Sequence, residues 1–193
     1  MRSSLLPVRG QLMLVSATSS LLLIIDMQNR LAPAITEFEN LTRACRWLIE
    51  VAHELHIPVM ATEQYPAGLG ATVQPLLGLL AGDQIHEKIH FNAAAEAHIR
   101  DAIADAAVKQ IVLAGCETHV CVLQSALGFK ALGYQVFVVA DAVCSRHLHD
   151  HTAALSRLQQ AGVVLLSREM LAFEWLERAG TPAFRRVSQQ FIK

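Results

Sequence analysis

The sequence has no hydrophobic run that approaches the ~20 residues needed to span a bilayer, although 53% of its 193 residues are apolar. It also has no excess of charge, because 16 Lys and Arg residues oppose 17 Asp and Glu residues. A chain without a strong field does not concentrate nucleic acid or anionic membrane around it. The composition therefore indicates one domain with a closed core and a small-molecule substrate, with neither nucleic acid nor membrane as a partner.

The sequence contains no CxxC pair, and its four cysteines are spread along the chain. This pattern favours reduced thiols over a disulfide framework, so we expect a cytoplasmic protein. Near the N-terminus, only residues 12–15 form a short apolar patch. We interpret 1–20 as a loosely ordered leader, with a cleaved signal peptide as the alternative, and 21–193 as the domain.

Short leucine-rich or β-branched runs alternate with longer amphipathic segments. We expect strands near 21–25, 58–62, 84–88, 110–114, 135–140 and 163–166, and helices near 37–56, 94–108, 119–132, 149–161 and 167–178. This alternation is typical of an α/β protein whose parallel sheet has helices on both faces.

Three chemically reactive residues follow or close predicted strands. Asp26 follows the strand at 21–25, Lys88 closes the strand at 84–88, and Cys121 begins the helix after the strand at 110–114. In open α/β sheets the active site lies at the carboxyl edge, so these side chains should converge there. A helix N-terminus and a neighbouring lysine both lower the pKa of a thiol. We therefore expect Cys121 to be the nucleophile and the most reactive thiol.

Each of these residues also has a purely structural interpretation. A free cysteine is commonly a small buried hydrophobic residue, Asp26 could belong to a turn or a helix cap, and Lys88 could be a solvated surface lysine. The loops at 64–70 and 141–146 follow strand ends and should line the pocket.

Three histidines, at positions 147, 149 and 151, could suggest a metal site. A carboxylate or thiolate third ligand at a defined spacing is missing, so we predict no metal site there.

Several motifs together resemble the isochorismatase-like cysteine hydrolases, and among them the isochorismatase domain-containing proteins. The resemblance extends from about residue 21 to residue 193. The motifs are LIIDMQ at 23–28, TEQYPAGLGATV at 62–73, EK at 87–88, GCETHVC at 115–121, VADA at 139–142 and SR at 145–146.

The resemblance implies a three-layer Rossmann-like fold with a six-stranded parallel sheet of order 3-2-1-4-5-6. It implies a catalytic triad of Asp26, Lys88 and Cys121. It also implies a cis peptide between Cys116 and Glu117, with an oxyanion hole formed by the N–H groups of Glu117 and Cys121. We place the substrate pocket at four further residues: Gln28, Gln64, Tyr65 and His119.

The departures from related families narrow the expected activity. Nicotinamidases of this superfamily bind a metal through an aspartate and two histidines after the second strand, where residues 63–70 contain no histidine. No metal or cofactor is therefore expected. Isochorismatases can act on a vinyl ether without a thiol, whereas this chain has Cys121.

We accordingly expect hydrolysis of a small amide-like C–N bond through a thioester on Cys121. The alternatives are a catalytically silent binding or regulatory module, a vinyl ether hydrolase, and a thiol redox protein with Cys116 as the resolving cysteine. The resemblance and the apolar tail at 173–192 predict a homo-oligomer.

Overall fold

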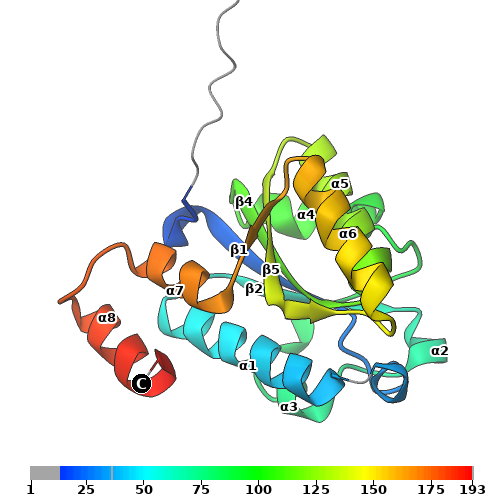
Figure 1. Ribbon diagram of the computed structural model, residues 1–193, viewed down its shortest axis with the longest axis horizontal. Helices are drawn as coiled ribbons and strands as arrows, with labels where there is room; N and C mark the ends of the chain where they lie inside the picture. The colour runs from blue at the N-terminus through cyan, green and yellow to red at the C-terminus, as the bar shows by residue number, and fades with distance from the viewer. Residues whose placement is uncertain (1–13, 36, 193) are drawn as a thin grey trace, which may run out of the picture.

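The computed structural model describes residues 14–35 and 37–192. A six-stranded sheet forms its centre, and helices surround this sheet (Figure 1). All strand pairs are parallel, and the order is β3-β2-β1-β4-β5-β6. The strands are β1 (Ser20–Ile25), β2 (Val59–Gln64), β3 (Ile85–Lys88), β4 (Gln110–Cys116), β5 (Gln135–Cys144) and β6 (Val164–Leu166). The predicted fold class and strand order are confirmed.

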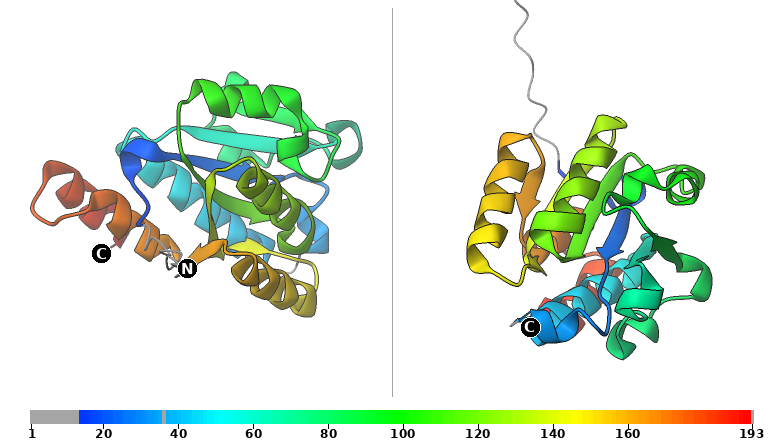
Figure 2. Two further views of the ribbon diagram at one scale, coloured as in Figure 1. Left: turned by 90° about the horizontal axis from the view of Figure 1, so that it is seen from above. Right: turned by 90° about the vertical axis from the view of Figure 1, so that its right-hand side faces the viewer.

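Helices cover both faces of the sheet (Figure 2). One face packs against α1 (Phe38–Glu54), α3 (Gln74–Leu77), α7 (Arg168–Leu176) and α8 (Pro182–Val187). The other packs against α4 (Ala97–Asp105), α5 (Leu123–Ala131) and α6 (Leu148–Gln160). The short helix α2 (Pro66–Leu69) lies in the loop after β2.

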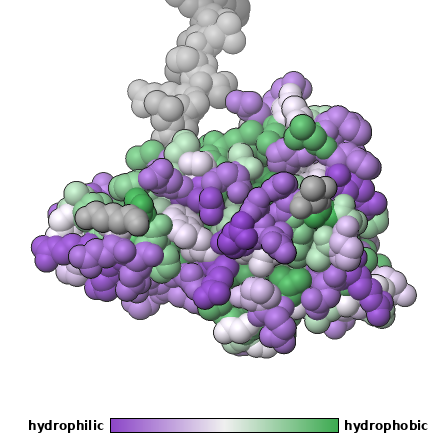
Figure 3. Space-filling model, turned by 60° about the horizontal axis from the view of Figure 1, so that its bottom comes forward, coloured by the Kyte–Doolittle hydropathy of each residue, from purple (hydrophilic) through white to green (hydrophobic). Residues whose placement is uncertain are grey.

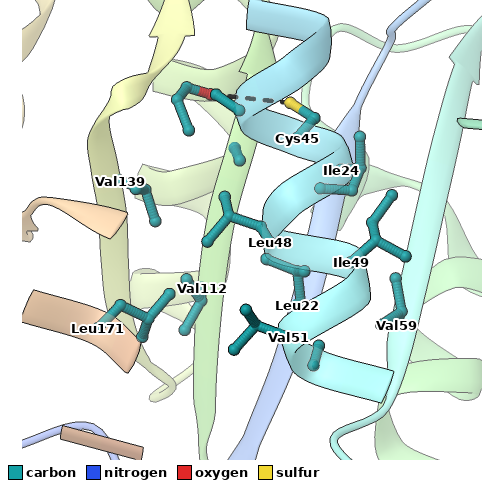
Figure 4. Packing of buried hydrophobic residues seen from close by; sticks show 14 of the residues in the cluster. Leu22, Ile24, Cys45, Leu48, Ile49, Val51, Val59, Val112, Val139 and Leu171 are labelled. Carbon is teal, nitrogen blue, oxygen red and sulfur yellow. Dashed lines mark hydrogen bonds between the residues drawn. The ribbon is translucent and has the colours of Figure 1, made fainter. Parts of the chain in front are cut away.

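The alternation of side chains along β1 explains how one strand serves two cores. Leu22 and Ile24 belong to the α1 side, where they pack near Leu48 (Figure 4). Leu21 and Leu23 face the opposite side, toward α5. A central parallel strand buried on both faces is expected to be apolar throughout. Each such side chain stabilises the fold by about 1.5–3 kcal/mol relative to full exposure.

Cys45 is a core residue of α1, as the amphipathic pattern suggests. Its thiol is fully buried and lies 4.0 Å from the carbonyl oxygen of Ala142 (Figure 4). Burial raises the pKa of Cys45 to about 12. All four cysteines are free.

Strand β5 is longer than the sequence pattern indicates, because it continues to Cys144. A register shift between Leu113 and Gly115 of β4 allows β5 to pair again at Val143 and Cys144. Most of the segment 141–146, expected as a loop, is therefore strand.

The prediction of a loosely ordered leader is wrong for residues 14–20, which pack against the domain. Val15 is buried and donates its N–H to the Glu174 carboxylate at 2.7 Å, while Ser16 donates to the Gln110 side chain at 2.7 Å. These partners are distant in sequence, so no local sequence pattern predicts the contacts. Residues 1–13 of the expected leader lie outside the described residues.

The surface on the α1 side is mixed in hydropathy. Figure 3 shows hydrophilic residues over much of this face, with smaller apolar areas between them. Within the described part of the chain, no helix has the length and apolar character required to cross a bilayer.

Candidate active site

The carboxyl ends of β1 and β3 bring Asp26 and Lys88 into direct contact. Asp26 follows β1 in a left-handed conformation, with φ of 50°. Its Oδ2 lies 2.8 Å from Lys88 Nζ, and its Oδ1 accepts a 2.6 Å hydrogen bond from Thr62 Oγ1. Both members of the ion pair have side-chain exposures of 1% or less, which excludes the surface interpretation of Lys88.

Gln64 connects this ion pair to Cys121. Lys88 Nζ donates to Gln64 Oε1 at 2.6 Å, and Cys121 Sγ lies 3.9 Å from the same oxygen. Gln64 Nε2 donates to the carbonyl oxygen of Ile89 at 2.7 Å, which fixes the orientation of the amide. The structure thus brings Asp26, Lys88 and Cys121 together and adds Gln64 between them.

The environment raises the pKa of both acidic groups. Burial raises the pKa of Asp26, and the opposing effects of Lys88 and Thr62 do not cancel it. Burial, with a second contribution from the Asp26 charge, raises the pKa of Cys121, whereas Lys88 lowers it. The expectation of a lowered thiol pKa is therefore wrong, because desolvation exceeds the effect of the lysine. The raised pKa favours the protonated thiol, so formation of the thiolate needs a proton acceptor.

Cys121 lies in a π-helical turn, Thr118–Val122, that leads into α5. The sequence pattern predicted a regular helix over 119–132. Single π-helical turns occur frequently at functional sites.

The approach of β4 to β1 depends on Gly115. Its φ is 109°, and a Cβ at this position would lie 2.1 Å from the carbonyl oxygen of Ile25. The next residue, Cys116, is fully buried, and its thiol contacts the carbonyl oxygen of Asp26 at 3.3 Å. The peptide between Cys116 and Glu117 is cis, as the resemblance implies.

The Glu117 side chain anchors the segment after β5. Arg146 Nη2 lies 2.7 Å from Glu117 Oε1, and the Arg146 backbone N–H donates to Oε2 at 2.9 Å. Burial alone would raise the pKa of Glu117, but the hydrogen bonds and charge of Arg146 outweigh it and lower the pKa. Arg146 also lines a hollow of about 690 Å³ between the start of α1 and the β5–α6 segment.

The four residues placed at the substrate pocket have different surroundings. Gln28 is fully buried, and its amide binds the backbone of Gln64 and Gly70, so it joins strand ends and does not line an open pocket. Gln64 belongs to the buried hydrogen-bond network. Tyr65 is 55% exposed at the end of β2. His119 is half-buried, with Nδ1 3.0 Å from Ser145 Oγ.

The sequence interpretation missed Thr62, and it gave Gln64 a different role. Alternate residues of β2 point to the same face, so Thr62 and Gln64 share the side that meets Asp26 and Lys88. This two-residue period is the signal that could have identified both.

The three histidines at 147, 149 and 151 do not converge. The rings of His147 and His149 stack with centroids 5.7 Å apart, whereas His151 Nδ1 lies 3.0 Å from Thr118 Oγ1. Among the residues in the described ranges, no group of three His, Cys, Asp or Glu side chains is placed to hold a metal ion.

Comparison with known proteins agrees with this architecture. The Isochorismatase domain model matches residues 20–170. Isochorismatase family protein 1A of Dictyostelium discoideum is 34% identical over 179 residues, which cover 90% of this chain and 86% of that protein. This chain belongs to the isochorismatase domain family.

Solved structures share the fold of this family member. A MAR1 ribonuclease from Caenorhabditis elegans superposes with a TM-score of 0.87 at 34% identity, covering 94% of this chain and 93% of that one. YcaC from Pseudomonas aeruginosa superposes with a TM-score of 0.81 at 22% identity, covering 93% and 98% of the two chains. At that lower identity the similarity concerns the fold alone.

Proposed function

We propose that this isochorismatase domain protein hydrolyses a small amide-like C–N bond through a thioester on Cys121. The observation that carries the proposal is the buried Asp26–Lys88 ion pair, which shares Gln64 with the Cys121 thiol. This arrangement supplies a nucleophile, a proton acceptor and a fixed positive charge, which acyl transfer to a thiol requires.

In the acylation step, Asp26 accepts the proton of the Cys121 thiol while the sulfur forms a bond to the substrate carbonyl carbon. The N–H groups of Glu117 and Cys121 stabilise the resulting oxyanion. The protonated Asp26 then gives its proton to the departing nitrogen, the C–N bond breaks, and an amine leaves the thioester behind.

In the deacylation step, Asp26 accepts a proton from water while the water oxygen bonds to the thioester carbon. The C–S bond then breaks, the sulfur regains a proton from Asp26, and a carboxylic acid leaves. Lys88 favours the ionised form of Asp26 between these transfers, because the ammonium opposes the rise in pKa that burial causes. The cycle consumes one water and requires no cofactor.

The test is a panel of small carboxamides, with turnover followed by product detection and the acyl adduct trapped for intact-mass analysis. We expect a substrate-dependent mass increase on the wild type and on Cys144→Ala, whose half-buried thiol lies outside the proposed triad. The Cys121→Ala variant should show neither adduct nor turnover, and a chelator should leave the wild-type rate unchanged. Turnover by Cys121→Ala, or loss of turnover on chelation, would contradict this mechanism.

RNA is the second candidate substrate, because the C. elegans structure at 34% identity is described as a ribonuclease. The same variants should therefore be assayed with an RNA oligonucleotide and with a vinyl ether. Cleavage of either compound without amide turnover would replace the amide proposal. Complete inactivity together with an unreactive Cys121 would favour the silent binding module.

A further inference from the structure

The segment directly after β3 presents consecutive backbone carbonyls to the proposed active site. The carbonyl oxygens of His90 and Phe91 lie 3.4 and 3.5 Å from Lys88 Nζ. The carbonyl oxygen of Ile89 accepts the 2.7 Å hydrogen bond from Gln64 Nε2. The conformation of residues 89–91 thus contributes to the positions of both Lys88 and Gln64.

A single carboxylate oxygen binds the N–H groups of this segment from the other side. Glu96 Oε1 accepts from Ile89 N at 2.9 Å and His90 N at 3.0 Å, and it lies 3.0 Å from His90 Nδ1. The hydrogen bonds from the backbone of His90 and then Ile89 lower the pKa of Glu96 to about 2. The carboxylate is therefore ionised throughout the neutral range, where hydrogen bonds to a charged acceptor are strong.

The helix that follows Cys121 holds the same segment at its far end. Ser125 Oγ of α5 accepts from Ala93 N at 2.9 Å and lies 3.4 Å from the carbonyl oxygen of Phe91. Glu96 and Ser125 therefore fix the segment from two directions. Glu96 is the charged member of the two and binds the residues nearest to Lys88.

We infer that Glu96 is a positioning residue of the proposed reaction, acting through the 89–91 backbone on Lys88 and Gln64. This inference rests on the proposed function of Cys121, Asp26 and Lys88. Without the carboxylate, the N–H groups of Ile89 and His90 lose their acceptor. The His90 N–H shares its peptide with the Ile89 carbonyl that binds Gln64, so this carbonyl can turn first. The next two peptides carry the carbonyls beside the ammonium and can then shift with it. Lys88 then keeps its contacts with Asp26 and Gln64 but loses the carbonyl contacts that help to orient its ammonium toward Cys121.

The charge of Lys88 determines the direction in which the pKa of Cys121 should change in the Glu96 variants. Its ammonium lowers the pKa of the Cys121 thiol and also that of Asp26. Displacement of the ammonium should therefore make the thiolate harder to form. If Glu96 only stabilised the fold, its loss would lower the melting temperature but leave the reactivity of the Cys121 thiol unchanged.

The experiment measures the rate of Cys121 alkylation by iodoacetamide from about pH 6 to about pH 10, with peptide mapping to isolate Cys121. We compare Glu96→Gln and Glu96→Ala with the wild type. Glu87→Gln is the matched control, because Glu87 is exposed and adjacent to Lys88 in β3. Melting temperatures are recorded for every variant.

We expect a graded effect, since glutamine retains an acceptor oxygen and alanine retains none. At neutral pH, alkylation should slow about threefold in Glu96→Gln and about tenfold in Glu96→Ala, with the profile moved upward by about half a pH unit and one unit. Glu87→Gln should follow the wild-type profile.

Wild-type profiles in both Glu96 variants, even with lowered melting temperatures, would reduce Glu96 to a structural role and overturn the inference. If Glu96→Ala does not fold, the alkylation profile of Glu96→Gln alone tests the inference. Alkylation needs no substrate, so a wild type that hydrolyses no amide defeats the proposed function only. Unchanged profiles in variants of an active enzyme defeat this inference only.

Discussion

At the scale of single residues, the site is governed by the removal of water from three ionisable groups. The 2.8 Å contact between Asp26 and Lys88 partly compensates their burial, while burial raises the pKa of the neighbouring Cys121. Storing a thiolate there would place two negative charges beside one ammonium. The proposed transfer of the thiol proton to Asp26 would avoid this, because the site would keep its net charge throughout the step.

The change Asp26→Asn tests this proton transfer. The amide keeps the size of the side chain but cannot accept the thiol proton, so amide turnover should fall by about 10²–10⁴-fold. Stability should also fall, by up to about 3–5 kcal/mol, because Lys88 keeps its buried charge and loses the opposing carboxylate. Both quantities are measured on one preparation, with turnover assayed well below the melting temperature.

Asp141→Asn is the matched control for Asp26→Asn. Asp141 pairs with Arg168 at 2.9 Å in a partly exposed position, where an ion pair contributes about 0–1 kcal/mol. It should retain turnover and nearly all stability. If folded Asp26→Asn keeps wild-type turnover, another group transfers the proton, with His119 the first to examine.

At the scale of elements, the site depends on how closely the ends of β1 and β4 approach. Gly115 makes this approach possible, and the next residues form the turn that leads to Cys121. At this connection from β4 to the turn that holds Cys121, the site therefore depends on the backbone conformation of Gly115 as well as on the reactive side chain of Cys121.

The change Gly115→Ala should destabilise the fold by at least about 2 kcal/mol. Its Cβ would meet backbone atoms of Ile25, which cannot rotate away, and its φ of 109° is strained for alanine. Urea unfolding of the variant measures the loss. Gly78→Ala is the control, because its φ is −70° and a Cβ there meets nothing within 4 Å. The free energy of unfolding of Gly78→Ala should be unchanged or higher by about 0.4–1 kcal/mol. Equal losses of unfolding free energy in both variants would refute the argument from the close approach of Gly115 to Ile25.

At the scale of the whole molecule, large apolar side chains remain exposed on β6 and on the helix that follows it. Val164 of β6 and Met170 and Phe173 of α7 are all exposed, Phe173 by 45%. Exposed apolar groups gathered on consecutive elements are typical of an interaction surface. Together with the family resemblance, they lead us to propose a homo-oligomer that uses the exposed residues of these two elements.

Sedimentation velocity should therefore give a mass that is a multiple of 21.1 kDa. The change Phe173→Asp should reduce this mass, because a buried, unpaired carboxylate disfavours the interface. Leu132→Asp should not reduce it, because Leu132 is also exposed but lies at the end of α5 on the other face. A wild type that sediments as a single 21.1 kDa species would contradict the proposal.

The sequence by itself determined the alternation of strands and helices and the position of Asp26, Lys88 and Cys121 relative to strand ends. These are local properties, because the period of apolar residues indicates whether a segment is a strand or a helix. Residues that directly follow parallel strands lie at the same edge of the sheet. The resemblance added the strand order and the cis peptide, both of which the structure contains.

Only the tertiary structure decided the raised pKa of Cys121, the burial of Lys88, and the contacts of Thr62, Gln64 and Glu96. Desolvation depends on everything that surrounds a group, and the partners of these side chains come from separate strands or from the turn of a loop. The packing of residues 14–20 against Gln110 and Glu174 is of the same kind. A linear pattern carries no measure of such distances, because they are fixed only when the sheet has formed.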